Sequence, residues 1–173
     1  MLYPDADADP RKRPYVIGAA DVLRITVWNN PNLSTDAAVG PGGTITLPLV
    51  GELQVAGRTA ASVQDEIAQH MAAYVKDAVV TLAVVEVNSY RFTVAGNVEH
   101  RGMFTPRYYV TVSEAIALAG GPTRYASTGD IIVIRTTARG RALRIPIDYD
   151  EILSGKRSDQ DIVILAGDTV LVP

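Results

Sequence analysis

Short apolar runs separated by turn-forming residues dominate the first third of the chain. Their alternation predicts three strands, over residues 22–28, 44–47 and 52–55. Pro41-Gly42-Gly43 divides the first two of these runs, and Gly51 turns the chain into the third. The pattern therefore indicates a meander of short strands.

The first predicted helix covers residues 59–74. Its apolar residues recur at helical spacing and form one stripe, made of Val63, Ile67, Met71 and Tyr74. Either Thr59 or Ser62 can cap the first turn through its hydroxyl oxygen. The run from Val79 to Val87 then predicts a strand, and because both of its sides are mostly apolar, we expect it to be central and covered on both sides.

A second module is predicted after Asn88-Ser89. It begins with strands over residues 90–95 and 102–106, followed by a helix over residues 111–119. Thr111 and Glu114 match a capping box at the start of this helix. Gly120-Gly121-Pro122 ends it, because glycine supplies a left-handed cap and proline cannot continue the helix.

The rest of the chain completes a mixed sheet around that helix. Strands are predicted over residues 131–135, 143–147, 162–165 and 169–172, with a helical turn at 152–155. A hairpin, one crossing helix and returning strands make a β-grasp fold. We therefore predict an α+β protein with a flexible tail (1–14), an N-terminal mixed-sheet module with one helix (15–88) and a C-terminal β-grasp module (89–173).

Composition narrows the classes of function. The chain has 173 residues, of which 47% are apolar and 20% charged, with a net charge of −3. These values are typical of a folded globular protein rather than a disordered one. The absence of a basic excess argues against a nucleic-acid partner. The absence of cysteine excludes disulfides, thiolate metal sites and cysteine nucleophiles.

No residue pattern indicates catalysis or cofactor binding. The two histidines, His70 and His100, fall in different predicted modules, so we expect no shared metal site. Neither a Gly-x-Ser-x-Gly elbow nor a glycine-rich phosphate loop occurs. The carboxylates at residues 148–151 fit a solvated turn better than an acid and base pair. We therefore predict no catalytic residue, no metal and no cofactor.

Two groups of side chains are candidate contacts. Four arginines flank the turn at Gly140, namely Arg135, Arg139, Arg141 and Arg144. Guanidinium groups bind carboxylate or phosphate bidentately, so an acidic polymer or a neighbouring subunit is the expected partner. The alternative is a charged tip that keeps an edge strand from aggregating. Tyr108 and Tyr109 can stack on sugar rings, or one of them packs in the core while the other faces solvent.

An ordered set of short motifs carries a family resemblance. The N-terminal half contains Tyr15–Gly18 with Asp21–Leu23, then Pro41–Pro48 and Val50-Gly51, then Val55-x-Gly57-x-Thr59 and Val79–Leu82. The C-terminal half contains Val94–Val98 with Gly102, then Thr111–Ile116, Ala119–Pro122 and Gly167–Pro173, in which Asp168 is expected to accept backbone N–H bonds. This order resembles the bacterial polysaccharide export family, the Wza-type outer-membrane components of capsule and exopolysaccharide secretion, over residues 15–173.

The resemblance implies a non-enzymatic export component of the periplasm, associated with the outer membrane and anchored there through a lipid on a cysteine upstream of this chain. It implies an octamer-like homo-oligomeric ring that passes the exported polysaccharide and joins an inner-membrane polysaccharide co-polymerase. The best-known members carry a second β-grasp domain and a pore-forming C-terminal helix, which this sequence lacks. We therefore expect a short member, or a piece of a longer one, that needs a separate outer-membrane barrel.

Two other interpretations stay open. In the first, the chain is a periplasmic saccharide-binding accessory module that uses its β-grasp domain. In the second, it is a polysaccharide lyase or hydrolase, although it lacks the paired carboxylates of such enzymes. The chain also departs from the family pattern in two turns, with Gly42-Gly43 where the family often has Asp-Gly and Gly18-Ala19-Ala20-Asp21 in place of Gly-x-Gly-Asp.

Overall fold

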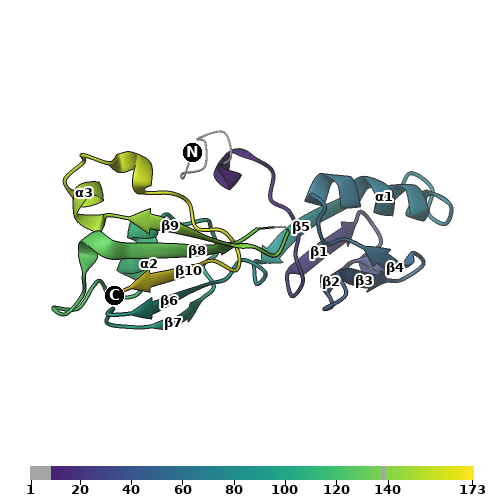
Figure 1. Ribbon diagram of the computed structural model, residues 1–173. Helices are drawn as coiled ribbons and strands as arrows, with labels where there is room; N and C mark the ends of the chain where they lie inside the picture. Colours follow the sequence, from purple (N-terminus) through teal and green to yellow (C-terminus); the bar gives the residue numbers. More distant parts are fainter. Residues whose placement is uncertain (1–8, 138) are drawn as a thin grey trace. The chain divides into compact units, whose positions relative to one another are not determined.

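The computed structural model describes residues 9–137 and 139–173. This part of the chain divides into two compact units, residues 14–89 and residues 90–173. The described residues before Pro14 group with the second of these units. Both units combine strands with helices (Figure 1), so the predicted α+β class is confirmed. The predicted tail covers residues 1–14, of which 1–8 lie outside the described residues and Pro10–Lys12 form a 3-10 turn, η2.

The N-terminal unit contains a three-stranded antiparallel sheet in the order β2-β1-β5 and a separate β3–β4 hairpin. Its strands are β1 (Val22–Val27), β2 (Thr35–Ala38), β3 (Thr44–Leu47), β4 (Gly51–Gln54) and β5 (Val80–Glu86). The predicted strands are present to within about one residue, a shift within the usual uncertainty of strand ends. The sequence pattern does not predict β2, which follows the 3-10 turn η3 (Pro31–Leu33) and pairs with β1.

Helix α1 (Ala60–Ala72) packs against β5 (Figure 1). The Thr59 hydroxyl accepts a hydrogen bond from the Ser62 N–H, so Thr59 is the N-cap. Three members of the predicted stripe are fully buried in the core of the unit, namely Val63, Ile67 and Met71. The prediction is wrong for Tyr74, which lies beyond the end of the helix and is 65% exposed.

Strand β5 lies at an edge of its sheet, which corrects the prediction of a central strand covered on both sides. Within the described residues it pairs with β1 alone. Val80 and Leu82 are buried in the core, whereas the alternate positions are open and Val85 is 37% exposed. Apolar residues occupy the open side of this strand as well, because exposed apolar side chains are common on protein surfaces, so their presence does not show that a side is covered.

The C-terminal unit contains a five-stranded mixed sheet in the order β7-β6-β10-β8-β9. The strands are β6 (Phe92–Gly96), β7 (Gly102–Phe104), β8 (Ile131–Thr136), β9 (Ala142–Ile147) and β10 (Thr169–Val172). The first and last strands, β6 and β10, lie side by side and parallel in the middle of the sheet (Figure 1). The other pairs are antiparallel. This arrangement is the predicted β-grasp.

Helix α2 (Val112–Leu118) supplies the other half of this core. The predicted capping box is present, because the Thr111 hydroxyl accepts from the Glu114 N–H while the Glu114 carboxylate accepts from the Thr111 N–H. Val112, Ala115 and Ile116 are fully buried. The fully buried sheet residues all share one face by register, and include Phe92, Val94, Val133, Ile145 and Val170. That face is therefore the one that packs against α2.

The chain between β9 and β10 differs from its prediction. The helical turn predicted over residues 152–155 lies earlier, as α3 (Tyr149–Leu153), and the 3-10 turn η5 (Ser158–Gln160) follows it. A further 3-10 turn, η4 (Thr128–Asp130), precedes β8. The strand predicted over residues 162–165 is wrong, because this segment makes a single bridge between Val163 and Thr111. Its buried side chains, Ile162 and Ile164, alternate as in a strand, which explains the error.

Candidate functional site

The four candidate arginines lie on the β8–β9 hairpin of the C-terminal unit. Its strands pair in antiparallel register from Ile131 opposite Ile147 to Thr136 opposite Ala142. At the tip, the Thr137 N–H donates to the Arg141 carbonyl oxygen at 2.8 Å. Gly140 has φ +74°, a left-handed conformation that glycine adopts without strain. The tip is therefore a closed turn, described except for residue 138.

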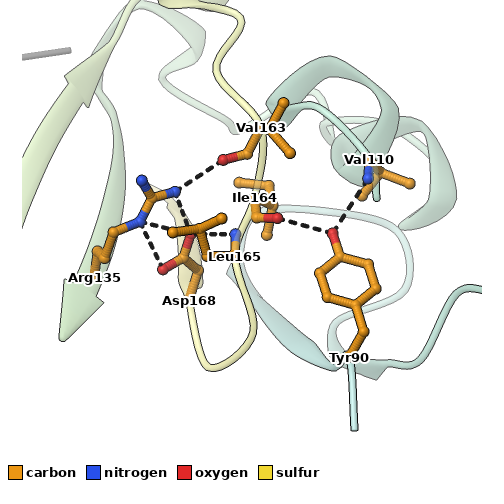
Figure 2. A network of polar contacts seen from close by, with 7 residues as sticks. All are labelled: Tyr90, Val110, Arg135, Val163, Ile164, Leu165 and Asp168. Carbon is orange, nitrogen blue, oxygen red and sulfur yellow. Dashed lines mark hydrogen bonds and ion pairs between the residues drawn. The ribbon is translucent and has the colours of Figure 1, made fainter. Parts of the chain in front are cut away.

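Arg135 is an internal residue of the unit rather than a surface contact. Its side chain is 13% exposed and pairs with Asp168, whose side chain is 1% exposed, at 2.6 Å. The guanidinium Nε donates to both carboxylate oxygens, and Nη2 also donates to the Val163 carbonyl oxygen at 2.8 Å (Figure 2). All of its described contacts are therefore with its own unit, which separates Arg135 from the other three arginines.

Asp168 joins β8 to the loop before β10. Its carboxylate accepts the Leu165 N–H at 2.7 Å in addition to the bonds from Arg135 (Figure 2). The prediction that Asp168 accepts a backbone N–H in its turn is confirmed. The buried charge is thereby paired and hydrogen-bonded, which is the condition under which a carboxylate is stable inside a protein.

Tyr90 fixes the same loop from the other side. Its hydroxyl donates to the Ile164 carbonyl oxygen at 3.0 Å and accepts from the Val110 N–H at 3.2 Å (Figure 2). Burial raises the pKa of Tyr90 to about 12, since the phenolate would lose its hydration. Tyr90 is only 2% exposed and serves as a structural group of the unit.

The remaining arginines of the hairpin, Arg139, Arg141 and Arg144, are exposed. Arg144 lies opposite Ile134, whereas Arg135 lies opposite Leu143. Because neighbouring strand positions point to opposite sides, Arg144 projects from the face opposite Arg135. In the described part of the chain no ion pair forms at any of these three side chains.

The two candidate tyrosines have different environments. Tyr108 is 66% exposed. Tyr109 is half-buried, and its ring centre lies 4.7 Å from that of Tyr90. The structure thus places one aromatic ring against the core and its neighbour in solvent, which is the arrangement of the alternative interpretation. A further exposed ring, Tyr125, was not singled out by sequence and carries the Arg124 guanidinium 4.7 Å above its centre.

A buried carboxylate in the N-terminal unit was also not singled out as a site. Asp21 is fully buried. It accepts the N–H groups of Asn88 and Ser89 at 2.8 and 2.7 Å, and the Tyr15 hydroxyl at 2.7 Å. The Gly18 N–H and the Ser89 hydroxyl complete its shell at 2.9 and 3.0 Å. Asp21 therefore ties the first and last segments of the unit together.

The described residues contain no cluster of three metal-ligating side chains. Nor is any helix among them both long and apolar enough to cross a bilayer. The carboxylates near residue 150 serve local structure, since Asp148 caps α3 through the Glu151 N–H and Asp150 accepts the Thr128 hydroxyl.

Two family models match the chain in sequence order. The polysaccharide biosynthesis/export protein family matches residues 9–85, and the SLBB domain matches residues 91–146. The two matches fall on either side of the division between the compact units after Ser89. Polysaccharide export proteins are non-enzymatic transport components.

Several curated proteins are similar to the chain. The EPS I polysaccharide export outer membrane protein EpsA of Ralstonia nicotianae is 31% identical over 97% of this chain and 50% of its own length. EpsA of Ralstonia solanacearum is 36% identical over 74% of this chain and 40% of its own length. The capsule polysaccharide export protein BexD of Haemophilus influenzae is 26% identical over 89% of this chain and 42% of its own length.

The chain spans about half, or less, of the length of these relatives. The two domain matches, their order and the named relatives agree with the resemblance found in the sequence motifs. The chain therefore belongs to the family of bacterial polysaccharide export proteins and carries an export domain followed by an SLBB domain.

Proposed function

We propose that the chain is a non-enzymatic component of an export system for exopolysaccharide or capsular polysaccharide. The observation that carries this proposal is the export domain followed directly by an SLBB domain. The Ralstonia relatives are named outer membrane proteins, which supports a place in the periplasm at the outer membrane. A lipid on a cysteine upstream of this chain would anchor it there.

The proposed working form is an octamer-like homo-oligomeric ring through which the polymer passes. The larger sheet of each unit ends in edge strands, β2 and β5 in one unit and β7 and β9 in the other. Edge strands present unpaired backbone groups that a neighbouring chain can bind, which supports lateral contacts between copies. In this proposal the ring joins an inner-membrane polysaccharide co-polymerase to a separate outer-membrane barrel.

Deletion of the gene tests the proposal. Cells without it are expected to make the polymer but to retain it, so surface polysaccharide falls while periplasmic polysaccharide rises. A plasmid copy of the gene is expected to restore export. Normal surface polysaccharide in the deletion strain would overturn the proposal. Native mass spectrometry of the protein extracted from membranes tests the ring separately, and a monomer at every concentration contradicts it.

The exposed rings of the C-terminal unit favour a second candidate function, a periplasmic saccharide-binding accessory module. Tyr108 and Tyr125 are 66% and 69% exposed, and such rings stack on sugars. Calorimetry with oligosaccharides of the organism's own polymer distinguishes the two candidates. A binding module is expected to saturate, whereas a conduit holds its cargo weakly so that the cargo can leave.

A further inference from the structure

The β8–β9 hairpin is the most one-sided charge feature of the chain. Between Asp130 and Asp148 there is no acidic residue, whereas four arginines occur. One of them, Arg135, is neutralised inside the unit by Asp168. The other three guanidinium groups lie within six residues, 139–144, and are exposed. A positive patch without an acid in its own segment attracts anions from solution.

The hairpin is held to its own unit close to its tip. Near the end of β8, Arg135 binds both Asp168 and the Val163 carbonyl oxygen, which fixes β8 to the loop before β10 (Figure 2). At the tip, the turn is closed by hydrogen bonds between Thr137 and Arg141. The turn that carries Arg139 and Arg141 is thus tied at its two ends by hydrogen bonds, and such restraint lowers the entropy lost on binding.

The chemistry of the tip selects the class of ligand. Guanidinium groups form paired hydrogen bonds with carboxylates, so a polymer with regularly spaced carboxylates meets several of them at once. A protein interface needs an apolar core instead. Between the arginines lie Gly140, Ala142 and Leu143, of which only Leu143, 40% exposed, has a large apolar side chain, too little for such a core. A charged, flexible polymer therefore fits better than the surface of another subunit.

Protection of the sheet edge does not account for the arginines. β9 is an edge strand, and charges on such strands do prevent aggregation. However, Pro146 already removes one backbone donor from this edge. Arg139 and Arg141 also lie outside the strand, in the tip. A role in binding an external anion explains their position.

We propose that Arg139, Arg141 and Arg144 form a binding surface for an anionic polysaccharide that carries carboxylates, such as a polyuronate. The inference rests on the proposed function for the polymer class and adds the charge of that polymer. Binding through exposed ion pairs is weak and reversible, as cargo on its way through a conduit requires. It is also sensitive to salt.

The test compares two triple variants with the same change in net charge. The first is Arg139→Gln, Arg141→Gln and Arg144→Gln. The control is Arg91→Gln, Arg101→Gln and Arg107→Gln, three exposed arginines of the same unit outside the hairpin. The probes are fluorescent oligogalacturonate and neutral dextran of equal length, measured by anisotropy at low and at high salt. Melting curves of both variants verify that they fold.

The 173-residue chain is expected to bind oligogalacturonate more tightly than dextran at low salt. The hairpin variant is expected to lose about tenfold in affinity, because three weak exposed pairs are removed together. The control variant is expected to stay within about twofold, a change set by net charge alone. High salt is expected to abolish the difference between the hairpin variant and the unaltered chain.

Four results overturn the inference. Failure of the unaltered chain to bind oligogalacturonate excludes the ligand, and equal binding of dextran excludes charge recognition. Equal losses in the two variants assign the effect to net charge. If the hairpin variant still binds oligogalacturonate but self-associates, the arginines serve to keep the β9 edge from aggregating. The gene-deletion experiment tests export without reference to the hairpin, so the failure of either proposal is recognised separately.

Discussion

Asp21 and Asp168 close the same turn in the two units. In each, the aspartate N–H donates to the carbonyl oxygen three residues earlier, of Gly18 at 3.3 Å and of Leu165 at 3.1 Å. The N–H of that earlier residue donates back to the aspartate carboxylate, at 2.9 and 2.7 Å. Each aspartate directly precedes a strand, β1 or β10. The turn thus fixes where the strand begins and buries a charge that the rest of the unit must satisfy.

The two turns differ in the residue just before the aspartate, and this difference predicts a stabilising substitution. Ala20 has φ +74° and Gly167 has φ +83°. An L-residue in this region costs about 1–2 kcal/mol, and the greater freedom of glycine in the unfolded chain offsets about 0.4–1 kcal/mol. Ala20→Gly is therefore expected to raise the free energy of unfolding by about 0.5 kcal/mol, measured by urea denaturation.

Gly167→Ala is the matched control for the turn. A Cβ at Gly167 would meet open space, so backbone strain is the main cost. The free energy of unfolding is expected to fall by about 1 kcal/mol. If both substitutions shift stability in the same direction, left-handed strain is not what distinguishes the two turns.

Replacing Asp21 by the nearly isosteric asparagine is expected to cause a large loss of stability. In Asp21→Asn, an NH2 group replaces one of the two carboxylate oxygens. That NH2 group then faces either the Gly18 N–H or the N–H groups of Asn88 and Ser89, none of which it can accept. We expect the free energy of unfolding to fall by about 2–4 kcal/mol, because buried donors lose their acceptor.

Asp36→Asn provides the comparison for Asp21. Asp36 pairs with Arg24, but both side chains are about half exposed. Exposed ion pairs contribute little because water and salt screen them. Asp36→Asn is therefore expected to leave the denaturation midpoint unchanged within error. Equal losses of unfolding free energy in Asp21→Asn and Asp36→Asn would show that burial of the Asp21 carboxylate does not matter for stability.

Local signals in the sequence predict most elements of this fold. The Thr111 and Glu114 capping box needs only residues three apart, and the stripe at Val63, Ile67 and Met71 needs only the helical period. The central parallel pair of strands follows from the order of hairpin, helix and returning strands. The same kind of signal places the left-handed turn at Gly140.

The features that the sequence does not predict depend on distant partners. Arg135 and Arg144 look alike in the sequence, and only Asp168, 33 positions further along, makes one of them internal. The five hydrogen bonds of Asp21 come largely from residues 67–68 positions away. Whether the second side of β5 is covered likewise depends on elements far along the chain. No period or local motif records such pairings.

Replacement of Arg135 is expected to cause a strong and specific loss of stability. Arg135→Met leaves the Asp168 carboxylate buried without its charge partner, which is expected to cost about 3–5 kcal/mol. Arg135→Lys restores the charge but not the planar fork that binds both oxygens, so we expect partial recovery. Denaturation by urea measures each variant.

Two further variants separate burial from charge. Arg144→Met removes the same charge from an exposed position and is expected to change stability by less than about 0.5 kcal/mol. Arg135→Met combined with Asp168→Asn removes both charges and is expected to be less destabilising than Arg135→Met alone. Should the double variant prove as unstable as the sum of its parts, the two side chains are not coupled.

The protein is expected to lose stability in alkali because of Tyr90. Burial raises its pKa to about 12, from 10.0 for an unperturbed tyrosine. The fold therefore prefers the neutral phenol, whereas the unfolded chain releases the proton near pH 10. Its contribution is complete below pH 10, declines as the pH rises and is lost near pH 12. The amount lost is on the order of 2 kcal/mol.

Tyr90→Phe isolates this effect. At neutral pH the variant lacks the hydrogen bonds to Ile164 and from Val110, so it is expected to be about 1 kcal/mol less stable. Between pH 10 and pH 12 its urea midpoint is expected to fall less steeply than that of the unaltered protein, because no buried phenol remains to ionise. Tyr108→Phe, at an exposed ring, is expected to keep the original slope. Parallel slopes for all three proteins would mean that Tyr90 does not link alkaline pH to unfolding, since the other titrating groups are common to them.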